Sequence, residues 1–258
     1  MNAFPFSPRI AQIILPALLI LGGVDASAQK DPLLSFSIEG LAEGDTIYLA
    51  NYYGNKMYYA DTASVGKKGR FDFVSPTPDK GGKYGLVLPG DAFVEFIVTG
   101  DAVSLTADVA NLPASVEVQD GLDTRLFYDY LDFIQTMREK RMPIDSRAQD
   151  STLTEAERAQ LVQDLEVLNI QVEAEQDRIQ EEHGETLFAK MIRMVREPDV
   201  PEAPVDAANP QLWRYYRFRD LYWDRVDFQD GRLVRDPALH TLLEQYWMSV
   251  MPQLPDTA

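Results

Sequence analysis

Apolar and polar residues alternate in short runs from Leu34 to Gln119, and glycine, proline and aspartate interrupt these runs about every ten residues. Residues two apart lie on the same face of a strand, so the pattern predicts an antiparallel sheet protein of seven or eight strands. We expect a β-sandwich domain over residues 33–121. The expected strands are 34–39, 46–53, 57–62, 70–74, 84–88, 93–99, 103–107 and 116–118.

One face of each strand is expected to be buried, because pairs of apolar residues recur two positions apart. The predicted core consists of Phe36 and Ile38, Ile47 and Leu49, Phe71 and Phe73, Leu86 and Leu88, and Phe96 and Val98. Between two of the strands, Gly54-Asn55 can supply the positive φ of a tight hairpin turn.

Beyond Gly121 the apolar period lengthens to between three and four residues, which predicts helices. The first helix should end near Pro143, because proline has no N–H for the helix interior. A second helix should begin near Ser151 or Thr154, whose hydroxyls can cap its positive end. The apolar stripe of the first helix is Leu126, Tyr130, Phe133, Ile134 and Met137.

The second helix carries a narrow apolar seam of the coiled-coil kind. Its members are Leu161, Val162, Leu165, Leu168, Val172 and Ile179. Asn169 falls where a buried polar residue would fix the register of packing. We expect the two helices to form an antiparallel hairpin, and the seam is also compatible with a dimer.

The rest of the chain is expected to be helical around one linker. A short helix is predicted at 185–196, so the hairpin and this helix together occupy 122–196. Four prolines between 198 and 210 predict an extended linker at 197–211. The segment 212–258 should hold an aromatic helix, which begins near 210 and ends near 224, and a last helix at 238–251. The expected fold class is α+β, an antiparallel β-sandwich followed by an α-helical domain with a long helix pair.

The N-terminus has the pattern of a secretory signal peptide. An apolar run from Ile10 to Val24 is too short for a membrane span and is followed by Ala26-Ser27-Ala28, a small-x-small cleavage site. We expect cleavage after Ala28, export to the periplasm or cell envelope, and no membrane insertion of the mature chain.

Charge and cysteine content restrict the chemistry of the chain. It has 24 basic and 41 acidic residues, a net charge of −17, which repels phosphate backbones, so nucleic acid is not an expected partner. It has no cysteine, and therefore cannot exchange thiols or build a cysteine-ligated metal site. No cofactor is expected.

No residue set in the sequence specifies a catalytic or metal site. His183 and His240 lie in different predicted helices and are interpreted as ordinary helix residues. Ser64 and Lys67 have the Ser-x-x-Lys spacing of some acyl transferases, but lie in a predicted turn rather than on the helix that this chemistry requires.

Three aspartates near Trp223 could hold calcium or a sugar hydroxyl, because residues four apart share a helix face. They are Asp220, Asp224 and Asp227. Salt bridges to nearby arginines are the favoured interpretation. These arginines are Arg217, Arg219 and Arg225.

Aromatic residues supply the candidate ligand or partner surface. Five tyrosines lie between 48 and 59 on a predicted hairpin, and alternation exposes some of them. Cross-strand packing is the simpler explanation for them. The candidate surface residues are Tyr52, Tyr53, Tyr58, Trp213 and Trp223.

Two segments resemble modules of exported proteins of the Bacteroidetes type. Asp61-Thr62-Ala63-Ser64-Val65, followed by Gly69-Arg70-Phe71-Asp72-Phe73, and the preceding Gly40 to Leu49 resemble a β-rich domain of unknown function. The stretch 213–256, with Tyr-Trp-Asp-Arg-Val-Asp-Phe at 222–228, resembles a helical domain of unknown function.

In that family both modules usually precede a thioredoxin-like domain of the thiol-disulfide interchange type. This chain has no Cys-x-x-Cys unit, so no catalytic residue can be carried over. Either it is the N-terminal arm of such a protein, with a thioredoxin-like domain beyond Ala258, or it acts as a separate chain. The resemblance implies a non-catalytic accessory or recognition module of a thioredoxin-like redox system, whose partner is the redox domain or its client protein. The alternative is an envelope glycan- or peptide-binding protein that uses exposed aromatic residues.

Overall fold

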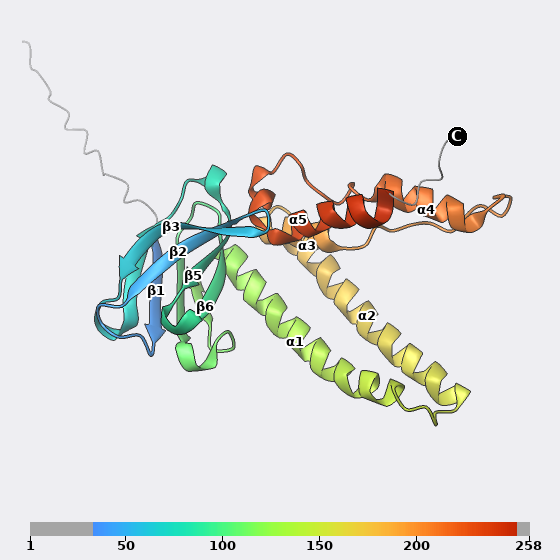
Figure 1. Cartoon of the computed structure of the whole chain (residues 1–258), viewed down its shortest axis with the longest axis horizontal. Helices are drawn as coiled ribbons and strands as arrows, with labels where there is room; N and C mark the ends of the chain where they lie inside the picture. Colours follow the sequence, from blue (N-terminus) through green and yellow to red (C-terminus); the bar gives the residue numbers. More distant parts are fainter. Residues whose placement is uncertain (1–32, 252–258) are drawn as a thin grey trace, which may run out of the picture. The chain divides into compact units, whose positions relative to one another are not determined.

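The structure, a computed structural model, describes residues 33–251, and two four-stranded sheets form its N-terminal part (Figure 1). Sheet A has the strand order β4-β1-β7-β8 and sheet B the order β3-β2-β5-β6. The strands of sheet A are β1 (Leu33–Glu39), β4 (Arg70–Val74), β7 (Val103–Asp108) and β8 (Glu117–Asp120). Those of sheet B are β2 (Thr46–Tyr53), β3 (Lys56–Ser64), β5 (Gly82–Val87) and β6 (Phe93–Val98).

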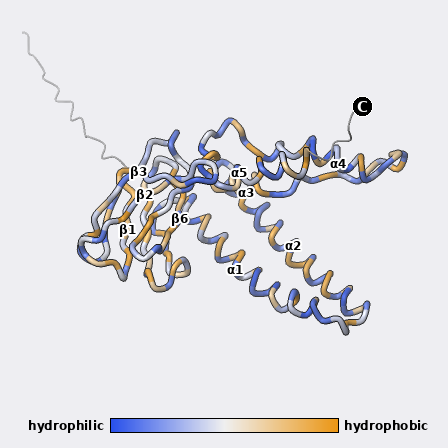
Figure 2. Tube along the Cα trace, in the orientation of Figure 1, coloured by the Kyte–Doolittle hydropathy of each residue, from blue (hydrophilic) through white to orange (hydrophobic). Residues whose placement is uncertain are grey.

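The two sheets pack face to face through the predicted core. All ten predicted core residues are buried, and the ring centroids of Phe36 in sheet A and Phe96 in sheet B lie 5.2 Å apart. Apolar and polar positions alternate along the strands, as Figure 2 shows for the trace. The period of two therefore identified both the strands and the residues that face inward.

The strand pairing differs from the expected antiparallel sheet at one place. β1 and β7 run parallel, from Leu34 opposite Val103 to Glu39 opposite Asp108. Sheet A is therefore mixed. Parallel neighbours need a long connection, and here the chain between β1 and β7 includes all four strands of sheet B and β4 of sheet A.

Helices α1 (Leu122–Ala148) and α2 (Glu155–His183) form the expected antiparallel hairpin. Thr154 caps α2 in a full capping box with Glu157. The prediction that α1 ends near Pro143 was wrong, since the helix continues to Ala148. The residues around this proline are solvent-exposed, so water can take the carbonyl that it leaves without a donor. An ion pair between Arg141 and Asp145 (3.0 Å) spans it as well.

The seam of α2 is used within the hairpin. Leu165, Leu168 and Val172 line a small cavity together with Ile134 and Met137 of α1. Two expectations for this seam were wrong: Val162 is 66% exposed and lies outside it, and Asn169 lines the cavity but is exposed rather than buried. A helix turns 100° per residue, so Val162 projects to one side of the neighbouring Leu161, which is buried.

Short helices complete the chain. They are α3 (Leu187–Val195), α4 (Pro210–Leu221), the 3₁₀ helix η5 (Gly231–Arg235), α5 (Pro237–Gln245) and the π-helix η6 (Tyr246–Val250). The proline-rich stretch between α3 and α4 has no regular structure, as predicted. No helix among residues 33–251 is long and apolar enough to cross a membrane. The predicted signal peptide and its cleavage site lie outside the described residues.

The strands come first in the chain and the α-helices follow them, so the fold class is α+β, as predicted. Sheets and helices belong to one unit. A second apolar cluster joins them on the outer face of sheet B, where Ile97 of β6 packs with Phe127 of α1 and Leu187 of α3. Thr124 of α1 fastens the edge of β6, because its hydroxyl accepts a hydrogen bond from Ile97 N (3.1 Å) and donates one to Ile97 O (2.9 Å).

Replacing Thr124 should therefore destabilise the protein strongly. Thr124→Val keeps the shape of the side chain but leaves the buried N–H and C=O of Ile97 without partners, and we expect a loss of about 2 kcal/mol or more in the free energy of unfolding. Thr136→Val is the control, because Thr136 lies exposed on the same helix and bonds only to the carbonyl of Asp132. Urea denaturation measures both; equal losses would contradict the role given to Thr124.

Candidate functional site

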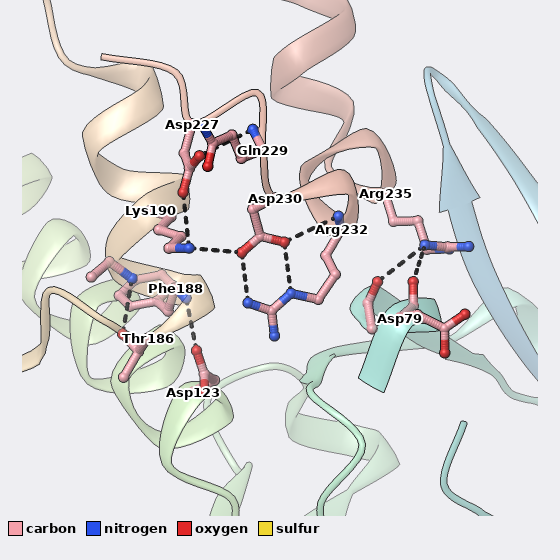
Figure 3. Close-up of polar contacts among 12 residues, drawn as sticks. Asp79, Asp123, Thr186, Phe188, Lys190, Asp227, Gln229, Asp230, Arg232 and Arg235 are labelled. Carbon is pink, nitrogen blue, oxygen red and sulfur yellow. Dashed lines mark hydrogen bonds and ion pairs between the residues drawn. The ribbon is translucent and has the colours of Figure 1, made fainter. Parts of the chain in front are cut away.

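A group of four paired charges lies where α3 and η5 meet (Figure 3). Lys190 Nζ lies 2.9 Å from Asp227 Oδ2 and 3.0 Å from Asp230 Oδ2. Arg232 binds Asp230 with two nitrogens, at 2.6 and 2.7 Å. The two cations thus share two carboxylates, and every charge in the group has a partner.

These contacts lower the pKa of two carboxyl groups. The hydrogen bonds from Arg232, and then that from Lys190, hold the pKa of Asp230 well below its ordinary value. The bond from Lys190 likewise lowers the pKa of Asp227. Both carboxylates therefore remain ionised at neutral pH and accept hydrogen bonds from their partners, which suits packing and not proton transfer.

Further polar contacts fix the helical segments to the ends of the strands. Asp123 at the start of α1 accepts a hydrogen bond from Phe188 N (2.7 Å), and burial raises the pKa of its carboxyl. Arg235 of η5 donates to the carbonyl oxygen of Asp79 (3.5 Å), as Figure 3 shows, and to that of Gly81 just before β5 (3.3 Å). Asp236 caps α5 and lies 3.7 Å from Lys83 of β5.

The tyrosine hairpin, β2 and β3 with their turn, places the three predicted tyrosines differently. Tyr52 is half-buried, and its hydroxyl donates to Glu95 Oε1 on β6 (2.8 Å); burial is the main cause that raises the pKa of this hydroxyl. Tyr53 and Tyr58 are 58% and 51% exposed. They lie diagonally on one face of the hairpin, because Tyr53 is opposite Lys56 and Tyr58 opposite Asn51.

The two predicted tryptophans lie elsewhere. Trp213 is half-buried on α4, and Trp223 packs against the rings of Tyr222, Phe228 and Tyr246. The five predicted residues therefore do not form one site; only Tyr53 and Tyr58 share a surface. The sequence analysis did not name three exposed apolar side chains near Trp223 or in η6 as candidate surface residues, although residues 246–248 form an apolar run. They are Phe228, Trp247 and Met248.

An open groove of about 600 Å³ lies between α4 and the end of α5 with η6. Its lining includes Tyr215, Phe218, Tyr222 and Val250, and Tyr215 OH donates to the carbonyl of Val250 (2.5 Å). Arg214 is its one cationic lining residue. The groove is aromatic and weakly charged, which suits an apolar side chain better than an ion.

The three aspartates near Trp223 do not come together into a calcium site. Asp227 pairs with Lys190, and Asp220 lies 3.4 Å from Arg219, in agreement with the salt-bridge interpretation for Asp220. Arg225 instead donates to the carbonyl of Arg196 and lies over the ring of Tyr222. Within the range 33–251, no group of three or more His, Asp or Glu side chains could hold a metal ion.

The remaining polar candidates, His240 and the pair Ser64 and Lys67, do not form a catalytic group. His240 Nε2 lies 3.2 Å from Glu244 Oε1, one helical turn away, a spacing that the sequence interpretation overlooked. The prediction of a turn holds for Lys67, which begins a 3₁₀ turn, but not for Ser64, which is the last residue of β3; the two do not share a helix.

No protein-family model and no curated protein matches this sequence. The resemblance to exported modules of the thioredoxin-like family therefore rests on the motifs quoted above and stays a prediction.

The charge cluster predicts a pH-dependent stability. A depressed pKa makes the Asp230 carboxylate stabilising at every pH above the unfolded-chain value of about 4, and this contribution disappears as the pH falls through the lower folded value. Asp230→Asn should cost about 2 kcal/mol of unfolding free energy at pH 7, and the difference from the native protein should shrink below pH of about 4. Urea denaturation at pH 7 and at pH 3 measures this. The exposed Asp224→Asn should change stability by less than about 0.5 kcal/mol, and a pH-independent difference for Asp230→Asn would refute the assignment.

Proposed function

We propose that this chain is a non-catalytic recognition module of an exported thioredoxin-like redox system, and that it binds a redox domain or its client protein on the tyrosine hairpin. The observation that carries the proposal is the exposure of Tyr53 and Tyr58 on one face of that hairpin. Tyrosine is enriched at protein interfaces, since it combines a large apolar ring with a hydroxyl.

The hairpin is held in place before any partner binds. Gly54 N in its turn donates to the carbonyl of Val234 in η5 (3.0 Å), and Tyr52 is tied to Glu95 across the sheet. A surface that is already ordered loses less conformational entropy on binding. The hairpin thus has the rigidity that a recognition surface requires.

Charge favours one class of partner. The net charge of −17 accelerates encounters with positively charged surfaces and slows those with acidic ones. We therefore expect a partner with a basic contact surface. The redox identity of the partner rests on the resemblance of residues 33–121 and 213–256 to modules that usually precede a thioredoxin-like domain.

A glycan is the second candidate ligand. On the opposite face of the hairpin from Tyr53, Tyr48 and Tyr59 are exposed with ring centroids 5.0 Å apart. Neighbouring rings with accessible faces offer a platform for the apolar side of a sugar. This observation keeps the glycan-binding alternative.

The proposal predicts a loss of binding in a hairpin variant. An exported thioredoxin-like protein from the same organism would be titrated against the native chain and against Tyr53→Ser with Tyr58→Ser by calorimetry. Loss of both rings should weaken binding by about tenfold or more. Phe228→Ser is the matched control, since it removes an exposed aromatic ring that does not belong to the hairpin.

Two outcomes would decide against the redox proposal. If the native chain and the hairpin variant bind the thioredoxin-like protein with equal affinity, the tyrosine hairpin is not the binding surface. Absence of binding to the thioredoxin-like protein, together with glycan-array binding that Tyr48→Ser with Tyr59→Ser abolishes, would favour the glycan alternative.

A further inference from the structure

The two edges of sheet B are treated differently. At the β6 edge, Thr124 bonds to both backbone groups of Ile97, and Tyr128 OH donates to the carbonyl of Glu95 (2.8 Å). Helix α1 thus bonds to both outward backbone groups of Ile97 and to the carbonyl of Glu95. The opposite edge is β3, in which every residue from Lys56 to Thr62 is exposed.

The register shows which groups β3 directs outward. Residues opposite one another in antiparallel strands exchange either both backbone hydrogen bonds or none. The carbonyl of Glu95 points away from β5, so Gly85 opposite it bonds to Ala50 on β2. Ala50 therefore directs its groups away from β3, and Tyr59 opposite Ala50 directs its own away from β2. Two residues earlier, Met57 does the same.

These outward groups form a short free edge. Among the described residues, no backbone hydrogen bond joins Met57 or Tyr59 to an element other than β2. Beyond Tyr59 the edge is interrupted, since the register shifts between Leu49 and Ala50 and Asp61 Oδ1 takes the N–H of Thr62 (2.7 Å). A bulge and a carboxylate on the edge are features that prevent strand pairing. The stretch from Lys56 to Tyr59 lacks both, and its one charged side chain, that of Lys56, lies at its end next to the turn.

We infer that the Lys56 to Tyr59 edge of β3 binds an extended, positively charged polypeptide segment by strand addition. The segment would extend sheet B beside β3, with main-chain hydrogen bonds to Met57 and Tyr59. The side chains of these residues, 44% and 69% exposed, would contact one face of the added strand and Tyr58 the other. The inference rests on the proposed recognition function and specifies how the hairpin holds its partner.

Charge decides between the candidate occupants of this edge. A second copy of the chain would bring two molecules of net charge −17 together through a stretch of four residues. A cationic segment is attracted by the same field. The occupant is therefore a basic extended segment of another protein.

A matched pair of substitutions separates backbone from side chain. Tyr59→Ala and Tyr59→Pro both remove the ring, but only proline removes the outward N–H, and an edge strand tolerates proline where the N–H faces solvent. The probe is a short fluorescent peptide of alternating lysine and valine, followed by anisotropy with the full chain. Tyr59→Ala should still bind it, and Tyr59→Pro should bind at least about fivefold more weakly than Tyr59→Ala. A peptide of alternating glutamate and valine should not bind.

The inference fails if the lysine–valine peptide does not bind, or if Tyr59→Pro and Tyr59→Ala bind it equally. It also fails if sedimentation shows a dimer of the native chain that Tyr59→Pro dissociates and Tyr59→Ala does not, since a second copy would then occupy the edge. Circular dichroism of each variant establishes that it is folded. If Tyr59→Pro proves to be unfolded, Met57→Pro and Met57→Ala replace the Tyr59 pair, and the same comparison of peptide affinities applies. None of these results alters the calorimetric test with Tyr53→Ser and Tyr58→Ser, so the two proposals can fail separately.

Discussion

The backbone of sheet B has more hydrogen-bonding groups than its strands can pair, and the arrangement of the other elements follows from this constraint. Unpaired buried N–H and C=O groups are costly, and an open edge also invites association with other chains. At the β6 edge, Thr124 bonds to the N–H and C=O of Ile97, and Tyr128 bonds to the C=O of Glu95. Once α1 is fixed there, Ile97 becomes part of a second core that the later helices complete.

Ionic contacts then determine how the C-terminal helices meet this core. The shared pairing of Lys190 and Arg232 with Asp227 and Asp230 holds α3 against η5, and the neighbouring η5–α5 segment contacts the turn of the tyrosine hairpin at Gly54. These four charges are paired with one another and hold the helical segments together. The surface that stays open to a partner is the β3 edge of sheet B, where tyrosine rings and the outward backbone groups of β3 face solvent.

Local patterns in the sequence predicted the elements well, whereas contacts between distant segments could not be predicted. A period of two found the strands and the buried Phe36 and Phe96, and the hydroxyl of Thr154 marked the start of α2. The parallel pairing of β1 with β7 depends on which strands become neighbours, a choice that alternation does not encode. The bond of Tyr52 to Glu95 and the pairing of Lys190 with Asp230 each join residues about forty apart, so no spacing rule applied.

The central claim is that sheet B is closed at β6 and open at β3, and amide hydrogen exchange of the free native protein measures it most directly. Closed by Thr124, the amide of Ile97 should exchange only through global unfolding, with the largest protection in the protein. The amides of Met57 and Tyr59, which have no acceptor in the described part of the chain, should exchange at close to unprotected rates. Fast exchange at Ile97, or protection at Met57 and Tyr59 equal to that of the paired Tyr58, would contradict the account.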